Sequence, residues 1–225
     1  MQIRIPYTPR KFQNYLHQRI RDYRWSVLVC HRRFGKTVCM INHLLMAALT
    51  SKVSNPRYAY IAPTFKQAKS IAWDYIKQFT HKIPGVRFNE TELRVDLPNK
   101  ARITLLGSEN CDGLRGIYLD GCVIDEYANV NDRLFPEIIR PALSDRKGFC
   151  IFIGTPQGMN NNFYELFQHA KGADDWFYFK AKASETKVVD QDELTKAKEV
   201  MGENKFKQEF ECDWIANIEG SIYGK

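Results

Sequence analysis

One lysine and one threonine in this chain have the spacing that phosphate chemistry needs. Gly35-Lys36-Thr37 lies between an apolar run at 25–29 and a second apolar run at 38–46 that predicts a helix. A loop between a strand and a helix presents free backbone N–H groups and a helix N-terminus to an anion. In that setting Lys36 would reach the β- and γ-phosphates of a nucleotide, and the Thr37 hydroxyl would bind Mg²⁺.

The loop before this lysine departs from the usual phosphate-binding pattern. Cys30 stands where the pattern has its first glycine, and Arg32 and Arg33 stand where small neutral residues are usual. A Gly-Lys-Thr tripeptide at a strand–helix turn also occurs by chance, so this segment alone leaves both interpretations open. The predicted nucleotide-binding loop consists of His31, Arg32, Arg33, Phe34, Gly35, Lys36 and Thr37.

Two adjacent carboxylates, Asp125 and Glu126, directly follow the apolar run at 121–124. Paired carboxylates after a buried strand are costly without a nearby cation, which favours a metal site over an ordinary acidic loop. Asp125 would orient Mg²⁺ through a water, and Glu126 would be the general base that polarises an attacking water. Together with Lys36, this pair favours nucleotide hydrolysis.

Three further side chains have the chemistry to act on a transferring phosphoryl group. Thr155 follows the apolar run at 148–153, where its hydroxyl would sense the γ-phosphate, although an ordinary Thr-Pro turn explains it equally well. Phosphoryl transfer builds charge that an arginine stabilises. Arg32 would act within its own subunit. Arg115, in a glycine-flanked loop, would approach another surface, or is simply a solvated arginine.

The elements that position these groups follow an α/β pattern. Apolar runs that predict buried strands lie at 25–29, 58–62, 121–124, 148–153 and 176–181, and shorter alternating strands at 86–88, 93–97 and 102–106. Predicted helices lie at 9–22, 38–46, 65–79, 191–201 and 203–212. Apolar strands between helices indicate a mainly parallel sheet covered on both faces, with ligands at the carboxyl ends of its strands.

Length and composition limit the domain organisation and the kinds of partner that this chain can have. A chain of 225 residues fits one large domain, or one domain with a small subdomain. We predict an ATPase core at 1–170, a lid or linker subdomain at 171–218 and the start of a linker at 219–225. A net charge of +7 fits a polyanionic partner or a solvated basic surface equally well. The six cysteines form no metal-binding pair, and no apolar run predicts a membrane span or a signal peptide.

Together these motifs resemble the ATPase domain of the large terminases of tailed bacteriophages, the motors that package double-stranded DNA into procapsids. The resemblance covers nearly the whole chain and rests on the segments 31–37, 113–116, 123–126, 154–156 and 206–210. It implies a RecA-like P-loop fold of the additional-strand, catalytic-glutamate type, with a C-terminal lid. It also implies that Tyr7 and Gln13 hold adenine, through an aromatic ring and a hydrogen bond.

The resemblance implies cofactors and partners as well. These are ATP, Mg²⁺, double-stranded DNA bound without sequence preference, the portal protein, the small terminase subunit and a homo-oligomeric ring of five subunits on the portal, which an isolated domain need not form. The implied location is the host cytoplasm, transiently at the procapsid portal, and not the mature virion. Large terminases also carry a nuclease domain, which would begin soon after Tyr223, so we expect no nuclease activity from these 225 residues.

Other functions compete with ATP-driven DNA packaging. A helicase-like translocase of the same fold ordinarily needs a second motor lobe, for which the chain is too short. A nucleotide-gated DNA-binding or assembly module without turnover has no need for a base such as Glu126. A small-molecule kinase needs an acceptor pocket, which no sequence feature marks. The sequence therefore favours an ATPase that moves DNA.

Overall fold

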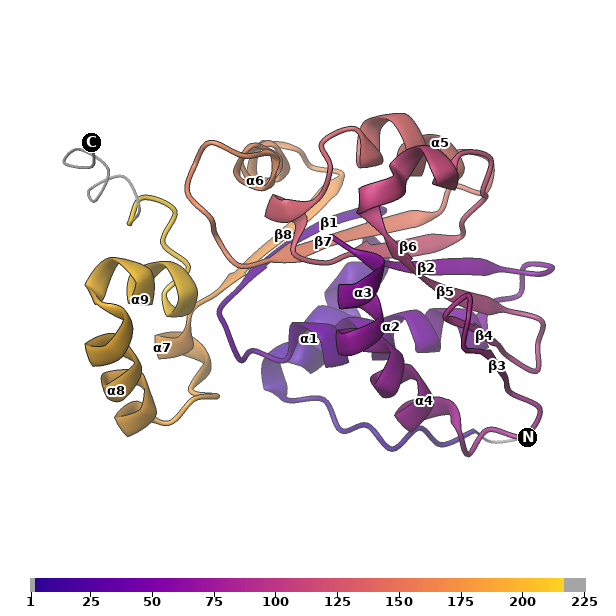
Figure 1. The fold of residues 1–225 in the computed structure, drawn as a ribbon, viewed down its shortest axis with the longest axis horizontal. Coiled ribbons are helices and arrows are strands. Elements are labelled where there is room, and N and C mark those ends of the chain that lie inside the picture. Colours follow the sequence, from indigo (N-terminus) through magenta and orange to yellow (C-terminus); the bar gives the residue numbers. More distant parts are fainter. Residues whose placement is uncertain (1–2, 217–225) are drawn as a thin grey trace.

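The computed structural model describes residues 3–216, which build a central sheet with helices on both faces (Figure 1). The sheet has the order β3-β4-β5-β2-β6-β7-β1-β8. All its pairings are parallel except β3 with β4 and β4 with β5. The strands are β1 Trp25–Cys30, β2 Arg57–Ala62, β3 Arg87–Asn89, β4 Arg94–Asp96, β5 Arg102–Gly107, β6 Gly121–Ile124, β7 Phe149–Gly154 and β8 Trp176–Ala181. The predicted mainly parallel α/β sheet is confirmed.

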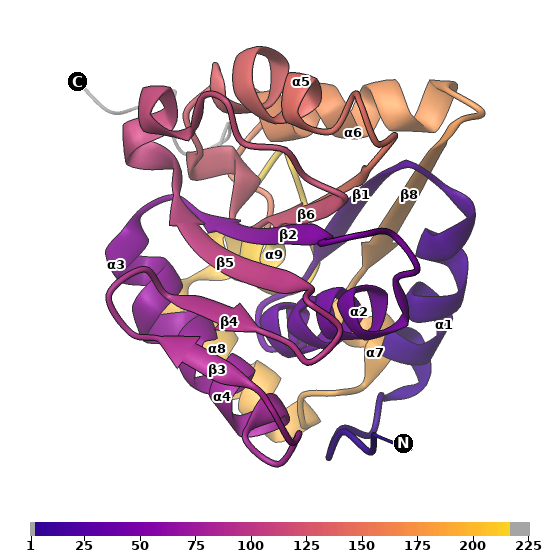
Figure 2. The same ribbon diagram turned by 90° about the vertical axis from the view of Figure 1, so that its right-hand side faces the viewer.

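Helices cover this sheet from both sides. Helices α1, α2 and α4 lie on one face, and α5 and α6 lie on the other (Figure 1, Figure 2). The helices are α1 Lys11–Arg19, α2 Lys36–Thr50, α3 Phe65–Ala68, α4 Asp74–Thr80, α5 Arg140–Ala142, α6 Asn162–Gly172, α7 Ala183–Thr186, α8 Gln191–Met201 and α9 Glu203–Phe210. A π-helical turn, Lys69–Trp73, joins α3 to α4 where one regular helix was predicted. Further short turns are 3₁₀-helical at Ile20–Asp22, Ser108–Leu114 and Tyr127–Asn129, and π-helical at Leu134–Ile139.

The two faces of β1 belong to two different apolar cores. Leu28 packs among α1, α2 and α4, whereas Val27 and Val29 pack among residues on the side of α5 and α6. Successive side chains of a strand point to opposite faces, so a strand covered on both sides must be apolar throughout. This burial explains the apolar run that precedes the Gly-Lys-Thr motif. The loop that carries the motif starts where the buried strand ends, after Cys30.

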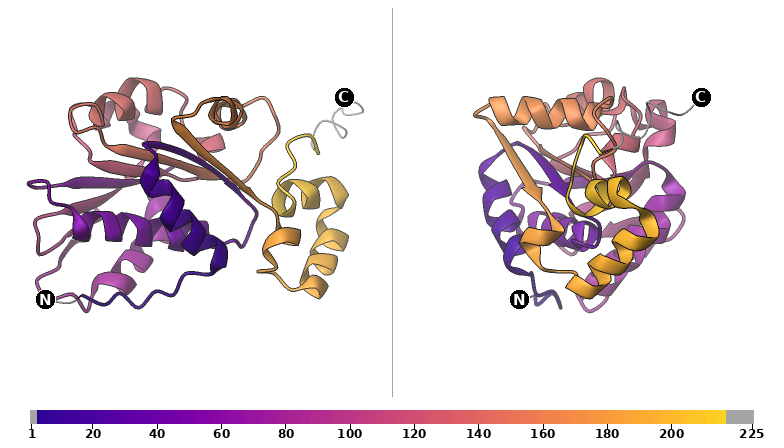
Figure 3. Two further views of the ribbon diagram at one scale, coloured as in Figure 1. Left: turned by 180° about the vertical axis from the view of Figure 1, so that it is seen from behind. Right: turned by 90° about the vertical axis from the view of Figure 1, so that its left-hand side faces the viewer.

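The last strand corrects the predicted division at residue 170. β8 pairs in parallel with β1, from Trp25 opposite Trp176 to Cys30 opposite Ala181, so it belongs to the central sheet. The separate helical unit therefore starts after β8, and we call α7, α8 and α9 the lid. It lies beyond one end of the sheet (Figure 3) and has a small apolar core of Ala183, Leu194 and Phe210.

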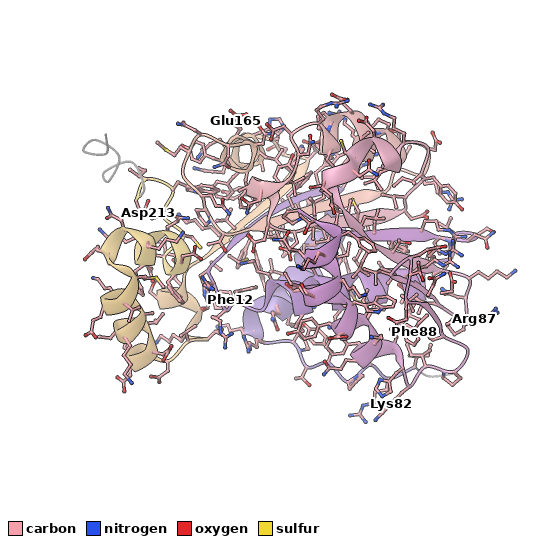
Figure 4. The ribbon with its side chains drawn as sticks, viewed as in Figure 1. Phe12, Lys82, Arg87, Phe88, Glu165 and Asp213 are labelled. Carbon is pink, nitrogen blue, oxygen red and sulfur yellow. The ribbon has the colours of Figure 1, made fainter. Side chains whose placement is uncertain are left out.

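The opposite end of the molecule carries the antiparallel strands. Arg87 and Phe88 of β3 lie there, away from the lid (Figure 4). Within residues 3–216, no helix combines the length and the apolar character that crossing a bilayer demands. The predicted linker at 219–225 falls outside the described residues.

Candidate active site

The loop between β1 and α2 forms an anion cradle. Gly35 has the left-handed backbone conformation (φ 85°), which turns the chain into α2 at Lys36. The backbone N–H groups of Gly35, Lys36 and Thr37 donate no hydrogen bond to any residue between 3 and 216. These unpaired N–H groups lie at the positive end of a 15-residue helix, so they attract a phosphate.

Lys36 connects the ends of three neighbouring strands. Its Nζ donates a hydrogen bond of 2.8 Å to the Thr155 hydroxyl, and it lies 3.4 Å from the Cys30 carbonyl oxygen and 3.8 Å from Glu126 Oε1. Because β6, β7 and β1 are adjacent and parallel, the residues that follow them meet at one edge of the sheet. The structure thus brings together the lysine, carboxylates and hydroxyl that the sequence suggested.

Asp125 is a buried carboxylate with three donors. The Thr37 hydroxyl donates to its Oδ2 over 3.3 Å, the Tyr60 hydroxyl donates to the same oxygen, and the Glu126 N–H donates to Oδ1 over 2.8 Å. A hydroxyl beside a carboxylate is the kind of oxygen set that Mg²⁺ takes, so Thr37 and Asp125 fit this ion. The sequence reasoning missed Tyr60, although a hydroxyl inside the apolar run at 58–62 was a usable signal.

Glu126 has the setting of a general base. Removal of water from around its carboxylate is the main cause that raises its pKa above the ordinary value, and the negative charges of Asp125 and Glu209 add to the rise, while Lys36 opposes it. The side chain remains 38% exposed, so water can reach it. A raised pKa brings a carboxylate closer to the pH at which proton transfer is efficient.

Two consecutive residues of α9 are among the lid residues that contact the site. The Arg32 N–H donates to the Glu209 carbonyl oxygen over 2.7 Å, and Gln208 Nε2 donates to the Pro156 carbonyl oxygen over 2.7 Å. The Arg32 guanidinium is 62% exposed and 3.9 Å from the Glu209 carboxylate. The sequence likened 206–210 to a closing helix but did not single out Gln208 or Glu209.

Comparison with known proteins identifies the family of this chain. A family model for the N-terminal part of the terminase large subunit, T4likevirus-type, matches residues 29–224. The chain belongs to the terminase large subunit family. It is 25% identical over 209 residues to the large terminase of Escherichia phage T5, and 31% identical over 126 residues to that of Thermus virus P23-45. These matches cover 89% and 48% of this chain but only 46% and 26% of those two relatives.

Solved terminase structures share the fold. The ATPase domain of the Thermus phage P74-26 large terminase matches with a TM-score of 0.78 at 21% identity, covering 93% of this chain and 95% of that one. The large terminase of a thermophilic bacteriophage, in a complex with ADP, matches with a TM-score of 0.76 at 13% identity. That second match covers 91% of this chain and 53% of the other. At these identities the likeness establishes the RecA-like architecture.

The adenine-binding pair predicted from the terminase resemblance is already occupied by protein contacts. Gln13 Nε2 lies 3.4 Å from the Phe34 carbonyl oxygen and 3.3 Å from that of Gly35, and its Oε1 accepts from the Arg10 N–H over 3.0 Å. The Tyr7 hydroxyl is 3.0 Å from His17 Nε2. The Gln13 side chain therefore braces the loop, and an adenine that hydrogen-bonds to Gln13 would compete with these contacts.

Three side chains of the predicted loop make no hydrogen bond or ion pair with Lys36, Asp125 or Glu126 within residues 3–216. His31 is fully buried, with Nδ1 2.6 Å from the Arg32 carbonyl oxygen and Nε2 2.7 Å from the Thr186 hydroxyl of the lid. Burial also lowers the pKa of His31. Phe34 packs in the core, and Arg33 points into solvent with a φ of 71°.

The contacts of Arg115 lie outside the phosphate-binding loop. Its Nε donates to Asp112 over 3.2 Å and its Nη2 to Glu137 over 3.4 Å, and 54% of the side chain is exposed. Within residues 3–216, no hydrogen bond or ion pair joins it to the phosphate-binding loop. In this arrangement Arg115 is held at the surface by two carboxylates and is half-exposed.

Proposed function

We propose that this chain is the ATPase domain of a phage terminase large subunit and hydrolyses ATP to drive double-stranded DNA into a procapsid. The observation that carries the proposal is the convergence of Lys36, Thr37, Asp125, Glu126 and Thr155 at one edge of the sheet. Family membership and a RecA-like fold support it.

Binding of ATP uses groups that the structure leaves available. The free N–H groups of the loop and Lys36 hold the phosphates, and Thr37 and Asp125 hold Mg²⁺. When bound, Mg²⁺ supplies charge neutralisation at the β- and γ-phosphates. Lys36 must turn from Thr155 and Glu126 towards the γ-phosphate, which frees both of these side chains for their own roles.

Hydrolysis then follows from the positions of the remaining groups. Glu126 accepts a proton from the attacking water, which makes that water a better nucleophile. The exposed Arg32 guanidinium stabilises the charge that builds on the γ-phosphate oxygens within the same subunit, whereas Arg115 would do so only for a neighbour. Thr155 senses the presence of the γ-phosphate through the lysine that it contacts.

The partners belong to the same proposal. A ring of subunits, five on the portal, would place Arg115 of one copy against the site of the next, and the small terminase subunit would join this assembly. DNA would be held through its phosphates, consistent with a net charge of +7 and with movement along any sequence. The assembly would act in the host cytoplasm at the procapsid portal and leave before the virion matures.

Steady-state ATP hydrolysis and nucleotide binding by Glu126→Gln test the enzymatic core of the proposal. This variant should bind ATP with wild-type affinity, because the amide keeps the size of the side chain, while turnover falls by about 10²–10⁴-fold. Glu199→Gln, on the exposed face of α8, is the matched control and should be unchanged. Wild-type turnover in Glu126→Gln would refute the base assignment, and binding without any turnover in the wild type would favour a nucleotide-gated module.

DNA packaging is tested in the full terminase. The same substitution in the complete large subunit should abolish ATP-driven uptake of DNA into portal-bearing procapsids while leaving assembly on the portal intact. Uptake at the normal rate would show that this site does not power the motor.

A further inference from the structure

Gln208 is a buried polar side chain whose NH₂ group has a hydrogen-bond partner while its carbonyl oxygen has none within residues 3–216. It lies on α9, is 3% exposed, and its Nε2 donates to the Pro156 carbonyl oxygen over 2.7 Å. Its Oε1 has no partner within residues 3–216. A carbonyl oxygen can only accept, so the amide must face Pro156 with its NH₂ group, and the oxygen is the group left unpaired.

Packing alone does not explain a glutamine at this position. A buried amide oxygen without a partner destabilises the folded state, and an apolar side chain of similar size would avoid that cost. The lid already has an apolar core of Ala183, Leu194 and Phe210. The hydrogen bond to the Pro156 carbonyl oxygen therefore explains why a glutamine occupies this position.

The hydrogen bond between Gln208 and Pro156 lies one residue from the Thr155 hydroxyl. Pro156 directly follows Thr155, whose hydroxyl accepts from Lys36 Nζ and donates to the Cys30 carbonyl oxygen over 3.3 Å. The neighbouring lid residue, Glu209, accepts from the N–H of Arg32 on the other side of the site. Two consecutive residues of α9 thus hold both the phosphate-binding loop and the end of β7.

We propose that Gln208 is a positioning residue that seats α9 on Pro156 and so holds the Thr155 hydroxyl opposite Lys36. The Thr155 hydroxyl is then held in place only while α9 is seated, and a shift of Thr155 is passed to α9 through the hydrogen bond between Gln208 and Pro156. The proposal rests on the ATPase function proposed above, because it assigns a role within that same site.

Two substitutions remove the hydrogen bond that Gln208 Nε2 donates to Pro156. Gln208→Glu keeps the size and the unpaired oxygen but replaces the NH₂ group that faces Pro156 with an acceptor. Gln208→Asn keeps the neutral amide but shortens the side chain by one methylene, so the amide no longer reaches. Gln191 lies on the exposed surface of the same lid, so Gln191→Glu and Gln191→Asn are matched controls.

Amide hydrogen exchange of Arg32, followed by NMR on the nucleotide-free chain, reports whether α9 is seated, because this N–H bonds to Glu209 of α9. We expect Arg32 to exchange on the order of tenfold faster in both Gln208 variants and at the wild-type rate in both controls. Amides inside β1 and β7 should keep their wild-type protection, which separates an unseated lid from a destabilised fold.

Kinetics supply the second readout. Both Gln208 variants should lower kcat several-fold with KM unchanged, because the loop N–H groups and Lys36 are intact while the Thr155 hydroxyl is less well placed. If Arg32 exchanges at the wild-type rate in both Gln208 variants, Gln208 does not seat α9. If Arg32 exchanges faster but kcat stays at the wild-type value, Gln208 has no role in positioning Thr155 for the reaction. A wild-type chain that hydrolyses no ATP would refute the proposed function and this role together, while Arg32 exchange would still decide whether Gln208 seats the lid.

Discussion

At the scale of single residues, two adjacent carboxylates have different environments. Asp125 accepts hydrogen bonds from Thr37, Tyr60 and a backbone N–H, which fix its orientation. The Glu126 carboxylate instead lies 3.8 Å from Lys36 Nζ and is 38% exposed, and burial of the remainder raises its pKa. This difference suits one carboxylate to orient a metal and the other to exchange protons.

The raised pKa of Glu126 predicts the pH dependence of turnover. The base works only when ionised, so kcat/KM should fall as the pH is lowered through the pKa of Glu126, at a pH higher than an unperturbed glutamate with a pKa of 4.5 would give. A pH–rate profile of ATP hydrolysis measures the position of this limb. A rate that stays flat down to the pKa of an ordinary glutamate would contradict the assignment.

Tyr60→Phe should weaken the metal site. Loss of the hydroxyl leaves the Asp125 carboxylate less firmly oriented, and loss of such an outer contact typically weakens metal affinity by about tenfold or more. The Mg²⁺ concentration needed for half-maximal nucleotide binding is the quantity to measure. Tyr58→Phe, on the same strand with its hydroxyl bonded to the Ala47 carbonyl oxygen, is the control that should not change it.

Residues that follow an apolar strand could be predicted, and residues that join distant segments could not. Lys36, Asp125 and Thr155 are expected to converge because the carboxyl ends of parallel strands meet at one edge. The contact between Tyr60 and Asp125 spans 65 residues, and that between Gln208 and Pro156 spans 52. No local pattern records which strands become neighbours, so such pairs emerge only from the folded chain.

At the scale of elements, the sequence predicted most strands and helices but not their assembly. β8 was recognised as a strand and yet assigned to the C-terminal subdomain, because nothing in its own residues shows that it pairs with β1. The helix predicted at 65–79 is interrupted by a π-helical turn. A single wider turn leaves the helical spacing of apolar residues nearly intact, so the pattern does not reveal it.

The contact between α1 and α2 predicts acid sensitivity of the fold. His17 and His43 stack with their Nδ1 atoms 3.2 Å apart. Burial, helped by the charge of Arg21, lowers the pKa of His17 to about 4 and that of His43 to about 3. Both are neutral when folded, so their contribution to stability is complete above an unfolded pKa of about 6.5 and is lost as the pH falls below it.

Urea unfolding across this pH range measures the effect. Each histidine should lower the free energy of unfolding by up to about 1.4 kcal/mol per pH unit below its unfolded pKa, until its folded pKa is reached. His43→Gln should flatten this slope, and His81→Gln, at an exposed position, should not. A slope unchanged in His43→Gln would show that the pair is not the source of the acid sensitivity.

At the scale of the whole molecule, Arg115 predicts that activity depends on association. Arg115→Ala should lose turnover by about a thousandfold if this arginine completes a neighbour's site. Mixing it with Glu126→Gln, which keeps Arg115, should restore turnover, because an intact base and an intact arginine then meet between two copies. Arg133→Ala removes a neighbouring exposed arginine that shares Glu137 and is the control.

Two outcomes would contradict an action between subunits. Turnover that does not recover on mixing would assign the transition-state charge to Arg32. A specific activity of the wild type that is constant with protein concentration would indicate a site that is complete within one chain.

The backbone of Glu126 has a consequence for how this protein tolerates change. Glu126 has φ 47° and ψ 48°, a left-handed conformation that costs a residue other than glycine about 1–2 kcal/mol. Glycine or asparagine would adopt it more easily and would remove a carboxylate whose partial burial raises its pKa. Selection for thermal robustness alone would therefore drive the glutamate out, and a library screened only for heat resistance should enrich inactive chains at this position.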